Sequence, residues 1–110
     1  MAFQERRKSE RRPYINSIEI YSQESKKMIN KGFIMNWCDE GFGIICPENL
    51  EAGKRVVLFF DIPNGMSFDF SGEVVHAEER LDSNSFGIRL MPGQLPYVNK
   101  FSQQVYYARQ

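Results

Sequence analysis

The sequence has few of the residues that build catalytic or metal sites. Its 110 residues include one histidine and two cysteines, and Cys38 and Cys46 have neither CxxC spacing nor a histidine beside them. This scarcity argues against a zinc site and against a small fold held by disulfides, so both thiols are expected to be reduced. The GxSxG, HExxH and GxxxxGK[ST] motifs are also missing.

An enzyme is therefore not expected, and no cofactor is expected either. His76 with Cys38 or Cys46 has the composition of a base and a nucleophile, but a strand histidine and two small apolar thiols are the simpler interpretation. No stretch approaches the roughly 18 apolar residues of a membrane helix, and the N-terminus is charged where a signal peptide is apolar. We expect a cytoplasmic protein that does not insert into membranes.

Charge is balanced over the chain but not along it. Fourteen basic and fourteen acidic side chains cancel, yet residues 1–13 hold five basic groups against two acidic ones. The rest of the chain is slightly acidic and has no general affinity for polyanions, which argues against a long nucleic acid as partner. The basic segment instead indicates a small anionic ligand.

Beyond the basic segment, apolar and polar residues alternate with period two between turn signals, which is typical of an antiparallel sheet with one buried face. A short amphipathic helix is expected over 97–105. The pattern predicts a six-stranded antiparallel β-barrel with a short C-terminal α-helix over 14–110, preceded by a flexible basic arm, residues 1–13. The expected strands are 14–21, 28–37, 42–46, 54–62, 66–77 and 86–90.

Period-two alternation also assigns faces. It places Trp37 on one face with Phe33 and Met35, and His76 on the face of Phe68, Phe70 and Val74. The strand 54–62 is apolar on both faces, which favours a central or barrel-closing position. Pro63-Asn64-Gly65 predicts a hairpin, and Gly41 ends a turn in which it is free to take positive φ.

In the arm, Arg7 and Arg11 lie four residues apart, just before the first expected strand. Two guanidinium groups spaced in this way suit clamping a phosphate, stacking on a purine or reading the O6 and N7 edge of guanine. The alternative is a solvated basic N-terminus.

Two motifs in this order resemble those of the PilZ domain family. The run ERRKSERRP over 5–13 is similar to the family's RxxxR opening, and NWCDEG over 36–41 is similar to its [DN]xSxxG motif. The resemblance implies a six-stranded antiparallel barrel with a C-terminal helix, and a bacterial receptor for the second messenger cyclic di-GMP.

The resemblance also implies a set of ligand contacts. Arg7 and Arg11 match the arginines that hold phosphates and guanines, Asn36 matches the residue that meets a guanine edge, and Gly41 matches the closing glycine. Cys38 stands where the family has serine, and the weaker thiol contact costs about 0.5 to 1.5 kcal/mol, up to about tenfold in affinity.

Three further side chains are candidate ligand contacts: Arg6, Arg12 and Trp37. The arginines suit a phosphate contact, or they are solvated. Trp37 belongs either to the core or to the ligand site, where it would stack on a base. Glu40, where the family often has a second glycine, is expected to pair with Arg6 or Arg12 if it does not repel the ligand.

The leading hypothesis is a receptor that binds cyclic di-GMP and relays the signal to an unidentified protein partner by ordering the arm, as a monomer or weak dimer. Cys38 and Glu40 motivate an alternative, a degenerate PilZ-like adaptor that binds a protein without nucleotide. A barrel that binds single-stranded nucleic acid through aromatic stacking is a third class, which the near-zero net charge disfavours. Another cyclic dinucleotide that shares one guanine is an alternative ligand.

Overall fold

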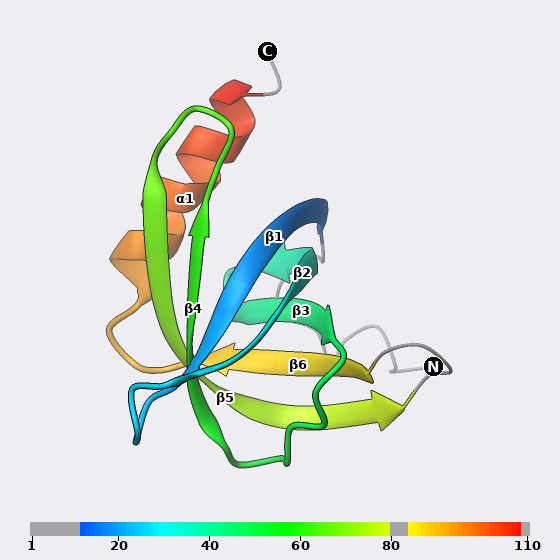
Figure 1. The fold of residues 1–110 in the computed structure, drawn as a ribbon. Coiled ribbons are helices and arrows are strands. Elements are labelled where there is room, and N and C mark those ends of the chain that lie inside the picture. The colour runs from blue at the N-terminus through cyan, green and yellow to red at the C-terminus, as the bar shows by residue number, and fades with distance from the viewer. Residues whose placement is uncertain (1–11, 80–83, 109–110) are drawn as a thin grey trace, which may run out of the picture.

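The computed structural model describes residues 12–79 and 84–108. Six strands close into an antiparallel barrel in the order β1-β2-β3-β6-β5-β4, and one helix follows (Figure 1), so the predicted fold class is confirmed. The elements are β1 Arg12–Ser22, β2 Met28–Cys38, β3 Gly41–Cys46, β4 Arg55–Asp61, β5 Ser67–Glu79, β6 Asn84–Leu90 and α1 Leu95–Ala108.

The first strand begins earlier than the alternation indicated. β1 starts at Arg12, so Arg12 and Pro13, assigned to the arm from sequence, belong to the first strand and pair with β2. The rest of the predicted arm, residues 1–11, lies outside the described residues.

The barrel closes through β4, as its two apolar faces predicted. β4 pairs with β1 over a short ladder from Glu19 opposite Phe59 to Ser22 opposite Val56. Beyond this ladder, the side chain of Asn16 in β1 donates from Nδ2 to the carbonyl oxygen of Asp61 at 3.0 Å. The two strands thus stay connected where their backbone ladder ends.

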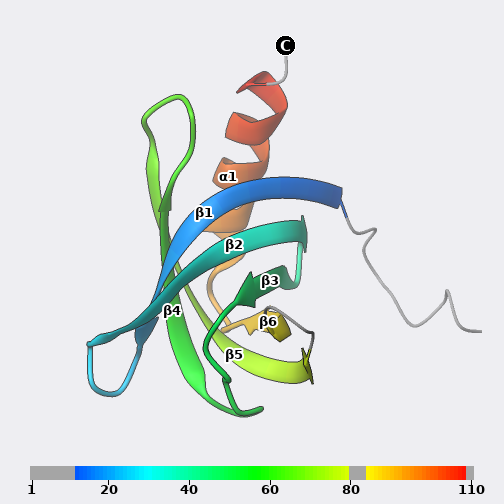
Figure 2. The same ribbon diagram turned by 45° about the vertical axis from the view of Figure 1, so that its right-hand side comes forward.

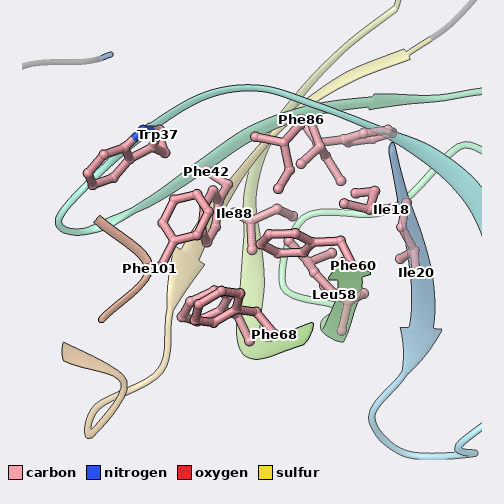
Figure 3. Packing of buried hydrophobic residues seen from close by; sticks show 14 of the residues in the cluster. Ile18, Ile20, Trp37, Phe42, Leu58, Phe60, Phe68, Phe86, Ile88 and Phe101 are labelled. Carbon is pink, nitrogen blue, oxygen red and sulfur yellow. The ribbon is translucent and has the colours of Figure 1, made fainter. Parts of the chain in front are cut away.

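Helix α1 contributes the centre of the aromatic core. Its inner face buries Val98, Phe101 and Val105, of which the first two are completely inaccessible. The Phe101 ring packs edge-on against Trp37, Phe42, Phe60 and Phe68, with ring centroids 5.2 to 5.7 Å apart (Figure 3). Since these rings come from four different strands, one helical side chain joins most of the barrel.

The hairpin between β4 and β5 extends beside α1 (Figure 2) and is tied to it. At its tip, Asn64 donates from Nδ2 to Oε1 of Gln104 at 2.7 Å. Gly65 takes φ of 91°, the left-handed conformation in which glycine is favoured, and this confirms the turn predicted from Pro63-Asn64-Gly65.

Two β-bulges overturn the face assignments made from strict alternation. In β2 the register shifts between Ile34 and Asn36, so Trp37 points inward with Ile34, and Phe33 is 47% exposed. In β5 the register shifts between Val74 and His76, so Val74 is buried and His76 is exposed. One extra residue in a strand moves every later side chain to the other face, and no residue type marked these two positions in advance.

Candidate ligand site where the arm meets the barrel

The second motif lies at the end of the barrel where the chain enters β1. In the β1–β2 ladder, Arg12 is opposite Trp37 and Pro13 is opposite Asn36. The residue that follows Arg11 is therefore already a strand neighbour of the motif. Arg6, Arg7 and Arg11 themselves lie outside the described residues, so their side chains are not placed.

Arg12 connects β1 to the motif through two contacts. Its guanidinium carbon lies 4.6 Å from the centroid of the Trp37 ring, and its Nη1 lies 3.8 Å from Oδ1 of Asp39. The partner of Arg12 is thus Asp39 rather than Glu40, whose backbone oxygen accepts a hydrogen bond from the Leu90 amide at 3.0 Å. A cation–π contact and a surface ion pair together hold the start of β1 against the β2–β3 turn.

The structure favours the core interpretation of Trp37. The side chain is 3% exposed and packs edge-on against Phe101, with Arg12 over its ring. A ligand that stacked on Trp37 would have to displace Arg12. The indole therefore connects the site to the aromatic core.

Asn36 and Cys38 are next-but-one neighbours at the end of β2. Asn36 lies opposite Gly43 and its carboxamide covers that glycine, because a methyl group added there would come within 2.6 Å of Oδ1. Cys38 pairs with Gly41 across the two-residue turn and is only 5% exposed. Asn36 thus offers its amide at the surface more openly than Cys38 offers its sulfur.

Gly41 is required for a reason that the sequence did not reveal. Its φ is not in the left-handed region, where the described glycines are Gly53, Gly65 and Gly93, so the positive φ expected for it is wrong. Instead, a Cβ at Gly41 would lie 1.9 Å from the carbonyl oxygen of Ile88. Only glycine lets β3 and β6 approach this closely, so the residue is explained by packing between strands.

Tyr14 stands behind this end of β1. It packs edge-on against Phe101 at 5.5 Å between ring centroids, and its hydroxyl donates to Oδ1 of Asn16 at 3.1 Å. Burial raises the pKa of the Tyr14 phenol, so the group remains a neutral donor at physiological pH. The contact fixes the curved start of β1 on the helix.

Sequence reasoning missed a groove of about 700 Å³ that spans β1 to β4 and is separate from the motif turn. Phe33, Ile45 and Phe59 line it, and Phe33 and Phe59 are 47% and 44% exposed. Apolar residues at outward positions of β3 and β4 were the sequence signal that could have indicated this groove. In β2 the bulge concealed the signal, because strict alternation put Phe33 on the face of Trp37.

Within the described ranges, no three His, Cys, Asp or Glu side chains gather in a way that would hold a metal ion. No helix described here has the length and apolar character to span a bilayer.

Fold and motif geometry define a small closed antiparallel barrel, a helix whose inner face packs onto the aromatic core, and a polar motif beside the entry of the first strand. The chain belongs to the PilZ domain family, whose model matches residues 5–107. A search of curated proteins found no match.

Solved structures give the same fold at low sequence identity. The PilZ domain with c-di-GMP of YcgR from Escherichia coli superimposes with a TM-score of 0.74 at 14% identity, covering 94% of this chain and 90% of that one. The Bacillus subtilis inhibitor of motility (MotI/DgrA) gives 0.67 at 10% identity; the match covers 94% of this chain and 53% of that protein. The PilZ domain of CeSA from a cellulose-synthesizing bacterium gives 0.59 at 14% identity, covering 81% and 89%.

Proposed function

We propose that this chain is a receptor for cyclic di-GMP that binds where the arm enters the barrel. The observation that carries the proposal is the β1–β2 register, which puts Arg12 opposite Trp37 and Pro13 opposite Asn36 in a PilZ barrel. The residue that directly follows RxxxR thus adjoins the second motif. The similar YcgR domain, described with c-di-GMP, supports the choice of ligand.

The proposed contacts follow from the chemistry of the ligand. Arg7 and Arg11 would neutralise its two phosphates and meet guanine acceptors, because guanidinium groups form bidentate charge-assisted hydrogen bonds. The Asn36 carbonyl oxygen would accept from guanine N–H groups. No bond is made or broken in this scheme, so the proposed activity is binding and not catalysis.

The proposed output is a change in the surface presented to a protein partner. Ligand phosphates would draw residues 5–11 against the barrel, and the new arrangement would favour or exclude that partner. Amide hydrogen exchange checks this step: protection of residues 5–12 should rise on adding cyclic di-GMP. Unchanged exchange at saturating ligand would contradict the relay while leaving binding intact.

Calorimetric titration with cyclic di-GMP tests the receptor function. The parent should bind near micromolar or tighter, about −8 kcal/mol, and the double variant Arg7→Ala, Arg11→Ala should not. The matched control Lys27→Ala, Lys54→Ala removes the same charge from exposed positions away from the motif turn and should bind like the parent. A folded parent that gives no heat would show that the receptor proposal is wrong.

One observation favours the adaptor as second candidate. The thiol of Cys38 is 5% exposed where the family has serine, while the groove offers Phe33 and Phe59 to a protein partner. Titration of the parent and of Cys38→Ser discriminates between the two. If neither binds cyclic di-GMP, the adaptor is favoured; if both bind, it is excluded as the sole function.

A further inference from the structure

Two exposed phenylalanines flank the outer face of β1. Phe33 of β2 is opposite Ser17, and Phe59 of β4 is opposite Glu19, so the two rings rise from strands about 10 Å apart. They are 47% and 44% exposed and line the groove of about 700 Å³. An exposed apolar groove of this size is typical of an interaction site.

The ring of Phe59 is held in place by its own fold. Tyr21, the next outward residue of β1 after Glu19, packs edge-on against this ring with the centroids 5.5 Å apart. The Tyr21 hydroxyl donates to Oε1 of Glu19 at 3.1 Å, so one side chain positions both the ring and the carboxylate. A partner that binds here meets an ordered surface, and little side-chain entropy is lost on binding.

Three carboxylates surround the Phe59 ring. Glu19 of β1 and Asp69 of β5 are opposite Phe59 on its two neighbouring strands, and Asp61 is the next outward residue of β4. Within the described ranges, none of the three carboxylates takes part in an ion pair. Among the residues placed by the structure, Lys31 is the one basic side chain that lines the groove. This end of the groove therefore combines apolar surface with an excess of negative charge.

The shape and the pairing of the strands select among possible occupants. A second copy that presented the same face would bring two hollows and two sets of carboxylates together. An extended peptide would leave most of its backbone polar groups without partners, because β1, β2 and β3 are already paired with one another beneath the groove. A helix satisfies its own backbone, and its diameter of about 10 to 12 Å matches the spacing of the two phenylalanines.

We propose that the groove binds an amphipathic helix of a partner protein, with an aliphatic stripe between Phe33 and Phe59 and with lysine or arginine beside the stripe. The cationic groups would contact the Phe59 ring and the three carboxylates around it, since both attract a cation. The inference deepens the proposed function by naming the chemistry of the protein partner, and its place in the relay rests on that function. The contact itself involves the barrel alone and is measured without nucleotide.

Two synthetic helical peptides test the groove directly. Both carry leucine at i, i+4 and i+7, and the flanking positions are lysine in one peptide and glutamate in the other. In NMR titrations of the full chain, the lysine peptide should bind with a Kd below about 1 mM and shift the amide signals of Phe33 and Phe59. The glutamate peptide should bind at least about threefold more weakly, and added salt should reduce the difference.

A pair of aromatic variants assigns the binding to the groove. Phe59→Ala removes the ring at the centre of the carboxylates and should weaken binding of the lysine peptide about 3- to 10-fold. Tyr97→Ala is the matched control, because Tyr97 is another exposed aromatic residue, on α1, and does not line the groove. This control should bind the lysine peptide like the parent.

A pair of charge variants tests the chemistry of the partner. Asp61→Asn with Asp69→Asn should weaken binding of the lysine peptide about 3- to 10-fold and leave the glutamate peptide no weaker. Glu24→Gln with Glu51→Gln removes two exposed carboxylates outside the groove and should have no effect.

The inference is overturned if the lysine peptide does not bind, if the glutamate peptide binds equally well, or if the groove variants bind like the parent. None of these results changes the calorimetric titration with cyclic di-GMP, so the receptor function is decided separately. Conversely, a parent that binds the lysine peptide but no nucleotide would support the groove and contradict the receptor function.

Discussion

The two faces of β3 carry opposite kinds of side chain. Its inner face presents Phe42, Ile44 and Cys46, which are 0%, 0% and 2% exposed, whereas its outer face begins with Gly41 and Gly43. The same six residues thus supply the core on one side, while on the other side the two glycines leave the backbone bare up to Ile45, which lines the groove. The inner face determines whether the barrel folds, and the outer face determines what can approach it.

The comparison extends to the glycines themselves. A side chain at Gly41 would collide with the backbone oxygen of Ile88 at 1.9 Å, but one at Gly43 would meet the end of the Asn36 side chain. Backbone cannot move aside without shifting a strand, whereas a side chain can turn away. Gly41 is therefore required by the packing of two strands, whereas Gly43 makes room for the Asn36 side chain.

Among the core residues, the largest loss of stability is expected at Phe101 of α1, whose ring packs on the inner faces of the strands. Phe101→Ala removes the ring that packs against four strands, and it should lower the free energy of unfolding by about 3 to 5 kcal/mol. Urea denaturation followed by circular dichroism measures the loss. Tyr97→Ala on the same helix, where the side chain is 56% exposed, should change stability by less than about 0.5 kcal/mol. Equal effects from the two variants would contradict the central role of Phe101.

Substitutions of the two glycines of β3 should differ in their effect on the free energy of unfolding. Gly41→Ala should cost about 1 to 3 kcal/mol of unfolding free energy, because the methyl group forces β3 and β6 apart. Gly43→Ala should cost less, since only the Asn36 side chain must move. Parallel urea titrations compare them, and a Gly43 variant as unstable as the Gly41 variant would refute the distinction.

The success of the predictions made from sequence follows the same division between inner and outer faces. Each expected strand is present because alternation of apolar residues reports directly which face is buried, as Ile18 and Ile20 show in β1. Alternation fails at a bulge, where one added residue reverses the faces. Trp37 and His76 were placed on the wrong sets of neighbours for this reason.

The site was only partly predictable. Asn36 and Cys38 are identified by their motif, but the pairing of Gly43 with Gly87 beside Asn36 joins β3 to β6, and no local pattern encodes it. The position of the His76 ring over Gly87 depends on the pairing of β5 with β6 and on the bulge together. Contacts between residues distant in sequence require the folded barrel.

The substitution Cys38→Ser tests the outer face at the end of β2. The hydroxyl is the stronger hydrogen-bond partner, so affinity for cyclic di-GMP should rise by up to about tenfold. Cys46→Ser is the control, because Cys46 is also buried, and its Sγ donates to the Glu48 carbonyl oxygen at 3.4 Å, away from the motif turn. Calorimetry on both variants should show the gain in the first alone; a gain in both would place its origin outside the site.

The smallest effect is expected at Arg12, which joins the two faces by contacting both the buried Trp37 and the exposed Asp39. The side chains of Arg12 and Asp39 are 45% and 51% exposed, so solvent screens their ion pair and most of the contribution comes from the cation–π contact. Arg12→Ala should lower the free energy of unfolding by about 0.5 to 1 kcal/mol and change the fluorescence of Trp37, the single tryptophan. Asp39→Asn removes the ion pair but keeps Arg12 over the ring, and it should have little effect on either measurement. If Asp39→Asn reproduced the whole effect of Arg12→Ala, the ion pair rather than the indole would hold the start of β1 against the motif.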